Sequence, residues 1–78
     1  MPRYFFNTVD GRRYPDEDGT DLPDLKAVRA EAARVLGELL KEQPQDLLAT
    51  GRLRLEVTDA AGANVLVLEV ALSNQIAA

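Results

Sequence analysis

The chain of 78 residues contains no cysteine, no histidine and no tryptophan. Without cysteine it can form no disulfide bond, no thiolate nucleophile and no thiolate-bound metal site. Without histidine it lacks the commonest metal ligand and the commonest general base at neutral pH. The sequence therefore predicts no catalytic residue, no metal ligand and no cofactor, and we expect a protein that is not an enzyme.

Positive charge and long apolar runs are also scarce. Nine lysines and arginines stand against 13 aspartates and glutamates, so the net charge is −4. Nucleic acid is therefore a disfavoured partner, because binding to phosphates depends on clustered positive charge. No apolar run approaches the roughly 18 residues of a membrane span, and Met1–Phe6 lacks the apolar stretch of a secretion signal. We expect a cytoplasmic protein without a membrane partner.

The longest periodic segment, residues 24–43, predicts one amphipathic helix. Asp24 is the expected N-cap, with Asp21 as the alternative, and Pro44 ends the helix because proline lacks an amide donor. Small residues along one flank are typical either of a solvent-facing surface or of close approach by a second helix; they are Ala27, Ala30, Ala33 and Gly37. The apolar residues recur at spacings of three and four, at Leu25, Val28, Ala32, Val35, Leu36, Leu39 and Leu40.

The segments on either side of this helix have the composition and alternation of strands. Asp10-Gly11 predicts a tight turn in the first pair, and residues 59–62 predict a turn in the second. The order strand, strand, helix, strand, strand indicates one α+β domain over residues 1–78. We expect a four-stranded, mainly antiparallel sheet with one helix on one face, with the first strand central beside the third or the fourth. The predicted strands are residues 3–8, 12–14, 52–58 and 64–72.

An acidic loop, residues 16–24, precedes the helix. Asp16, Asp18 and Gly19 match part of a calcium-binding loop, but the glycine offset is wrong and the bidentate glutamate is missing. A docking site for a basic partner is a second alternative. The sequence favours a solvated loop whose carboxylates lie near the positive end of the helix dipole.

The last predicted strand is apolar on both faces, whereas one helix can cover only one face of the sheet. We therefore expect an apolar patch on the uncovered face, which is typical of a partner surface. The sequence predicts a homodimer, or binding of another protein, with Phe5, Val65 and Val67 as interface residues. The alternative is that Leu47, Leu48 or the C-terminal tail covers this face.

The first predicted hairpin supports a different hypothesis. Arg3, Arg12 and Arg13 lie close in sequence to the aromatic residues Tyr4, Phe5 and Tyr14. Together they could bind a small ligand or anion, or bind nucleic acid weakly by stacking bases on aromatic rings. The alternative is an arginine-flanked edge that resists aggregation.

The chain as a whole resembles a family of short bacterial proteins of about 80 residues, mainly alphaproteobacterial and of unknown function. The resemblance implies a stand-alone bacterial domain and no activity, cofactor or site residue. The matching segments are Met1–Phe6, Asp10-Gly11, Asp16–Gly19, Leu22–Leu25 and Val28–Ala33.

Overall fold

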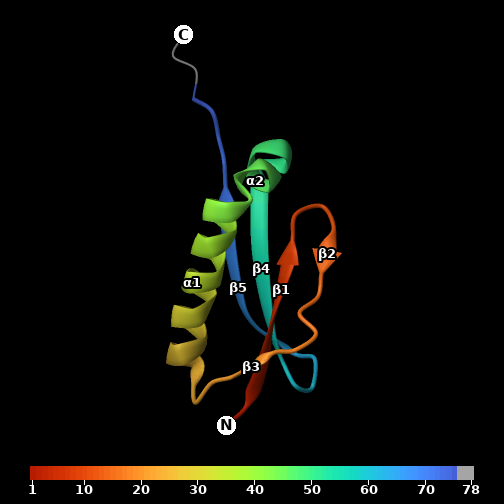
Figure 1. Ribbon diagram of the computed structural model, residues 1–78, viewed down its shortest axis with the longest axis vertical. Coiled ribbons are helices and arrows are strands. Elements are labelled where there is room, and N and C mark those ends of the chain that lie inside the picture. The colour runs from red at the N-terminus through yellow and green to blue at the C-terminus, as the bar shows by residue number, and fades with distance from the viewer. Residues whose placement is uncertain (76–78) are drawn as a thin grey trace.

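An open antiparallel sheet and two helices make up the computed structural model, which describes residues 1–75 (Figure 1). The α+β prediction is confirmed, and the predicted strands and helix agree with the structure to within about one residue at most ends. Residues 76–78 of the C-terminal tail lie outside the described part. The elements are β1 (Arg3–Val9), β2 (Arg13–Tyr14), β3 (Thr20–Asp21), α1 (Leu25–Glu42), α2 (Pro44–Thr50), β4 (Arg52–Asp59) and β5 (Asn64–Ala71).

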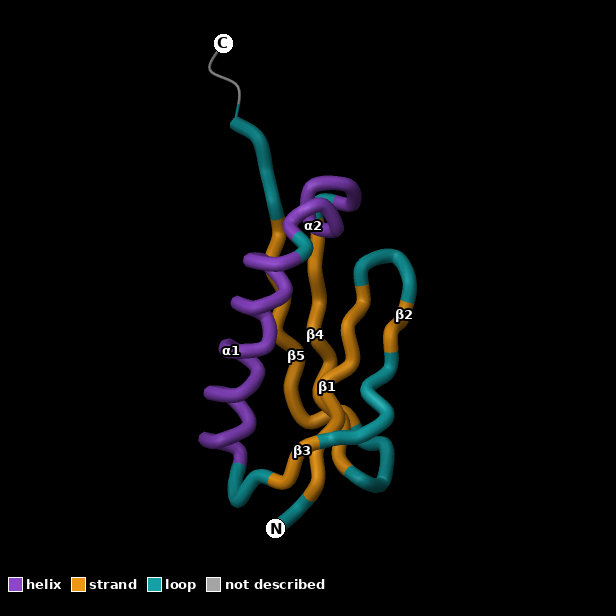
Figure 2. The backbone as a smooth tube through the Cα atoms, in the orientation of Figure 1, coloured by secondary structure: helices purple, strands orange, loops and turns teal. Residues whose placement is uncertain are grey.

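The sheet has the strand order β2-β1-β4-β5 (Figure 2). β1 is central and pairs with β4, so the structure places the first predicted strand beside the third. β2 and β3 both pair with the other edge of β1, at its two ends, and β5 forms the opposite edge of the sheet. All of these pairings are antiparallel.

Two elements go beyond the prediction of four strands and one helix. β3 has two residues, which is too short for a sequence pattern. α2 begins at Pro44 and has seven residues, where the sequence predicts the end of the preceding helix and at most a short helical turn at Leu47 and Leu48. The end of α1 and the start of α2 have one cause. Proline cannot continue α1 but is well suited to the first turn of a new helix, where no amide donor is needed.

The core lies between the sheet and α1. Leu53, Leu55 and Val57 alternate along β4 and are at most 1% exposed, as expected for one face of a half-buried strand. Val28 and Ala32 of α1 are fully buried. Tyr4, Phe6 and Leu36 are also buried on this side of the sheet.

Gly37 is the one helical position where the sequence works against α1. A side chain placed there would meet nothing within 4 Å, and its backbone is not in the left-handed region. We expect Gly37→Ala to raise the free energy of unfolding by about 0.5–1 kcal/mol, because alanine restricts the unfolded chain and favours the helix. Thermal unfolding should show a melting temperature higher by roughly 2–8 °C. An unchanged or lower melting temperature would show that Gly37 has a packing role.

Candidate protein-interaction surface

One side of the sheet faces away from α1, and we call it the open face. Alternation along β4 defines it, because Arg54 and Glu56 point opposite to the buried leucines. The cross-strand registers extend it into two rows, each crossing β1, β4 and β5. These rows are Asn7, Glu56 and Val67, and Val9, Arg54 and Glu69.

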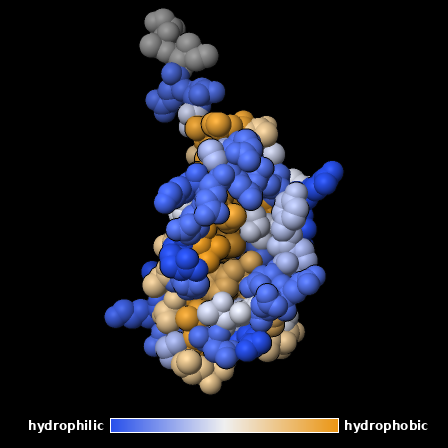
Figure 3. Space-filling view, in the orientation of Figure 1, coloured by the Kyte–Doolittle hydropathy of each residue, from blue (hydrophilic) through white to orange (hydrophobic). Residues whose placement is uncertain are grey.

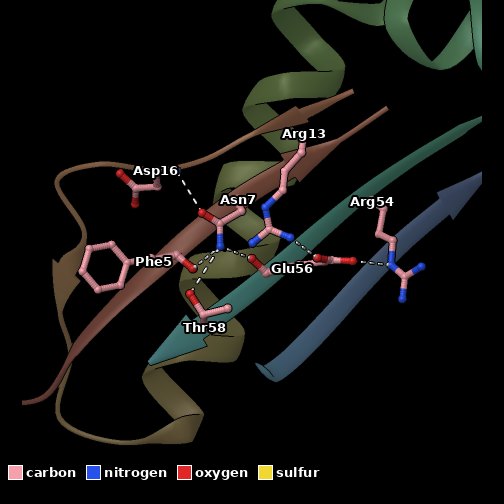
Figure 4. Close-up of polar contacts among 7 residues, drawn as sticks. All are labelled: Phe5, Asn7, Arg13, Asp16, Arg54, Glu56 and Thr58. Atoms are coloured by element: carbon pink, nitrogen blue, oxygen red, sulfur yellow. Dashed lines mark hydrogen bonds and ion pairs between the residues drawn. The ribbon is translucent and has the colours of Figure 1, made fainter. Parts of the chain in front are cut away.

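Glu56 is the centre of a charged network on the open face (Figure 4). Its Oε1 lies 3.1 Å from Arg13 Nη1, and its Oε2 lies 3.3 Å from Arg54 Nε. The Glu56 side chain is 17% exposed, whereas the two arginine side chains are about half exposed. Exposed pairs of this kind contribute up to roughly 1 kcal/mol each. Their larger effect is to fix two guanidinium groups on the surface.

Asn7 lies beneath this network and is 3% exposed. Its Nδ2 donates to the carbonyl oxygen of Glu56 at 3.2 Å and to Thr58 Oγ1 at 3.3 Å. Its Oδ1 accepts from the backbone N–H of Asp16 at 2.9 Å (Figure 4). Asparagine is disfavoured in strands, so a buried asparagine among aromatic residues is a signal that the sequence analysis missed. The hydrogen bonds join β1, β4 and the acidic loop.

Asp16 closes a gap along the outer edge of β1. Its Oδ2 accepts from the backbone N–H of Phe6 at 3.1 Å, between the points where β2 and β3 pair with β1. Its Oδ1 accepts from the backbone N–H groups of Asp18 and Gly19 at 3.1 and 3.2 Å. The carboxylate therefore substitutes for a neighbouring strand, and it does not lie at the start of α1. Asp24 caps α1 as predicted, with Oδ1 2.9 Å from the Ala27 nitrogen.

The structure gives the acidic loop no features of a metal site. Within residues 1–75, no group of three or more carboxylates is arranged so that it could hold a metal ion. The loop instead folds over the open face, with Gly19 packed against Phe5 and Arg3 at a positive φ of 75°. A Cβ at Gly19 would lie only 2.9 Å from Phe5 Cε1, so this close approach depends on glycine.

The three predicted interface residues occupy different environments. Phe5 lies on the open face but is half-buried beside the acidic loop. Val67 lies on the open face and is 43% exposed. Val65 packs against the core cluster, because a register shift between β4 and β5 inserts it as an extra residue. The uncovered apolar surface is therefore smaller than the sequence suggests, and the interface role of all three residues stays a prediction.

The structure separates the residues of the alternative site on the first hairpin. Arg3 pairs with Asp21 at 3.0 Å, and this hydrogen bond holds the pKa of the Asp21 carboxyl below its usual value. Arg13 pairs with Glu56, and Tyr4 is buried in the core. Arg12 and Tyr14 are exposed at the end of the hairpin.

A shallow hollow lies on the helix side of the sheet. It measures about 510 Å³ and separates the end of the first hairpin from α1 and α2. Figure 3 shows hydrophobic surface between hydrophilic flanks on this side of the molecule. The lining residues are Thr8, Asp10, Tyr14, Leu39, Gln43, Gln45 and Asp46.

Comparison with known proteins gives one match. The model of a family described as a domain of unknown function (DUF6894) matches residues 3–71. No curated protein and no solved structure matches the chain. Within residues 1–75, neither helix is long and apolar enough to cross a membrane.

Proposed function

We propose that this chain, which belongs to the DUF6894 family of domains of unknown function, is a non-enzymatic protein-interaction module that binds a second copy of itself. The observation that carries the proposal is the surface of β4 and β5 that no element of residues 1–75 covers. Val67 is 43% exposed in the middle of β5, next to the Arg13–Glu56–Arg54 network. An apolar residue surrounded by fixed charges is typical of a specific protein contact.

The proposal includes the setting in which the module acts. We infer a bacterial, cytoplasmic domain from the resemblance of the chain to short bacterial proteins. A small domain gains stability when a partner covers its exposed apolar surface. A homodimer would supply that partner wherever the protein is made.

Val67→Glu tests the self-association. We expect the wild-type chain of 8.5 kDa to show twice its mass by light scattering, and the variant to show the mass of one chain. The new carboxylate would put an unpaired charge into the contact. The monomer should stay folded, because Arg13 and Arg54 lie beside Glu56, the cross-strand neighbour of position 67.

Ala61→Glu in the exposed turn between β4 and β5 is the matched control, since it adds the same charge away from the surface. It should leave the dimer intact. A wild-type monomer throughout a dilution series would contradict self-association. A folded Val67→Glu dimer would remove Val67 from the contact.

Ligand binding at the first hairpin is the second candidate function. Exposed Arg12 and Tyr14 favour it, but Arg3 and Arg13 already have carboxylate partners. A saturable rise of the melting temperature with inorganic phosphate would support this candidate. If the protein bound a nucleic acid with an affinity that fell steeply as salt was added, nucleic-acid binding through the phosphate backbone would be supported.

A further inference from the structure

We propose that β5 pairs with β5 of a second copy, antiparallel and about a twofold axis at Leu68, so that two sheets join into one. The inference rests on the proposed self-association and names its contact. The two edges of the sheet differ in whether other elements cover them. The outer edge of β1 is closed by β2, Asp16 and β3, whereas no strand of residues 1–75 lies beyond β5. Proteins normally protect such an edge or use it for pairing.

The free edge of β5 presents a regular row of backbone groups. The backbone N–H of Leu72 donates to the carbonyl oxygen of Gly51 at 2.8 Å. Because backbone groups alternate in direction along an antiparallel strand, the groups of Leu66, Leu68 and Val70 face β4. The groups of Val67 and Glu69 therefore point outward. A second β5 would offer them matching donors and acceptors.

The apolar side chains of β5 are also incompletely covered. Leu66, Leu68 and Val70 are cross-strand neighbours of Val57, Leu55 and Leu53, respectively, and share their core side of the sheet. The three β4 residues are at most 1% exposed, but the three β5 residues stay partly exposed. A second β5 would continue this apolar row across the joint.

The charges exclude one of the possible registers. With the axis at Leu68, Glu69 lies opposite Val67 of the partner subunit, and Leu66 lies opposite Val70 of the partner subunit. Moving the axis to Glu69 would place two glutamates directly opposite each other, which is unfavourable. With the axis at Leu68, residues 65–71 of the two strands lie opposite one another, which is all of β5 except Asn64. An axis at Val67 would instead place Val65, the extra residue of the register shift, opposite Glu69 of the partner subunit. Each Glu69 also keeps Arg54 as its cross-strand neighbour.

The position of α1 is compatible with this arrangement. It contacts both β4 and β5, and Figure 2 shows it running along β5. Because it contacts both strands, α1 lies over the space between β4 and β5. Strands lie about 4.8 Å apart, and the twofold axis would lie half a spacing beyond β5. The axis of α1 would therefore lie about 5 Å from the twofold axis. The two copies of α1 would then run about 10 Å apart, which is close to the distance between packed helices.

The flank of α1 that would meet the other helix carries a small residue at Ala33. Leu39 lines the hollow beside Thr8 and Tyr14, on the side of α1 nearer the first hairpin. Ala33 lies about 120° around the helix from Leu39, and it is exposed in the single chain. A small residue allows helices to approach closely, which is one of the two alternatives that the sequence leaves open for this flank.

Cysteine substitution tests the contact directly, because the native chain has no cysteine. At the proposed axis the two Leu68 residues form a pair without backbone hydrogen bonds, with Cα atoms about 4.5 Å apart. This distance suits a disulfide bond. We expect most of the oxidised Leu68→Cys protein to run as a covalent dimer on a non-reducing gel.

Three further variants control for position and folding. Leu66→Cys and Val70→Cys alone should not cross-link, because each lies four residues, or about 13 Å, from its own copy. The double variant Leu66→Cys/Val70→Cys should cross-link between chains. The double variant leaves Leu68 in place, so it keeps the test valid if Leu68→Cys fails to fold.

Val67→Lys separates the edge contact from packing of one open face on another. Lysine would lie opposite Glu69 of the partner subunit, so the edge-paired dimer should persist, while Val67→Glu dissociates. If the wild-type chain is a dimer but Val67→Lys is a monomer, edge pairing is overturned and self-association is kept. The same holds if the wild-type chain is a dimer and no β5 cysteine variant cross-links. A wild-type monomer would overturn both.

Discussion

Leu55→Ala should leave the chain largely unfolded at modest urea concentrations. Leu55 is 0% exposed and lies in the middle of β4, between β1 and β5 and beneath α1. Removing its side chain loses buried apolar contact and opens a cavity, which costs about 2–5 kcal/mol. A domain of this length has about 4–12 kcal/mol of total stability. Circular dichroism during urea unfolding, at one fixed protein concentration, measures the loss.

Leu48→Ala provides the control for this prediction. Leu48 is also a leucine, but it is 66% exposed in α2. Its truncation should change the free energy of unfolding by no more than about 0.5 kcal/mol. If Leu55→Ala were as mild as Leu48→Ala, β4 would not be the centre of the core.

Asp16→Asn should lower the free energy of unfolding by about 1–3 kcal/mol, although the two side chains have nearly the same shape. The carboxylate of Asp16 accepts from three backbone N–H groups, with both of its oxygens. In asparagine one oxygen becomes an NH₂ donor, so at least the N–H of Phe6 or those of the loop lose their acceptor. The same unfolding experiment measures the effect, and amide hydrogen exchange at Phe6 should speed up.

Asp18→Asn is the matched control, because it makes the same chemical change two residues away in the same loop. The Asp18 side chain is exposed and accepts no side-chain hydrogen bond within residues 1–75. It should therefore leave both stability and exchange at Phe6 nearly unchanged. Equal effects of the two variants would mean that loop charge, and not the amide contacts of Asp16, holds the edge of β1.

The parts of the fold that the sequence predicts well are those set by local periodicity. The alternation of Leu53, Leu55 and Val57 fixes which side of β4 is buried. The spacing of apolar residues and the cap at Asp24 fix α1. In both cases the determining residues are neighbours along the chain, so their physics is visible without a structure.

The parts that the sequence does not predict depend on distant partners. Asn7 contacts Thr58 and Glu56 across the sheet, and Asp16 takes the place of a strand beside Phe6. The exposure of Val65 likewise depends on a register shift against β4 that no local pattern signals. The candidate surface was therefore predictable only in outline, as the side of the sheet opposite the helix.

The pairing of β1 with β4 also constrains how the chain acquires its structure. Phe6 is the partner of Val57, so β1 can pair with β4 only after the whole segment between them has been synthesised. Contacts between such distant segments form late, because closing the intervening loop costs entropy. The hairpin of β4 and β5 is local, so we expect it to form early and to act as the template on which β1 docks. Until β1 docks, both edges of that hairpin remain open to other chains.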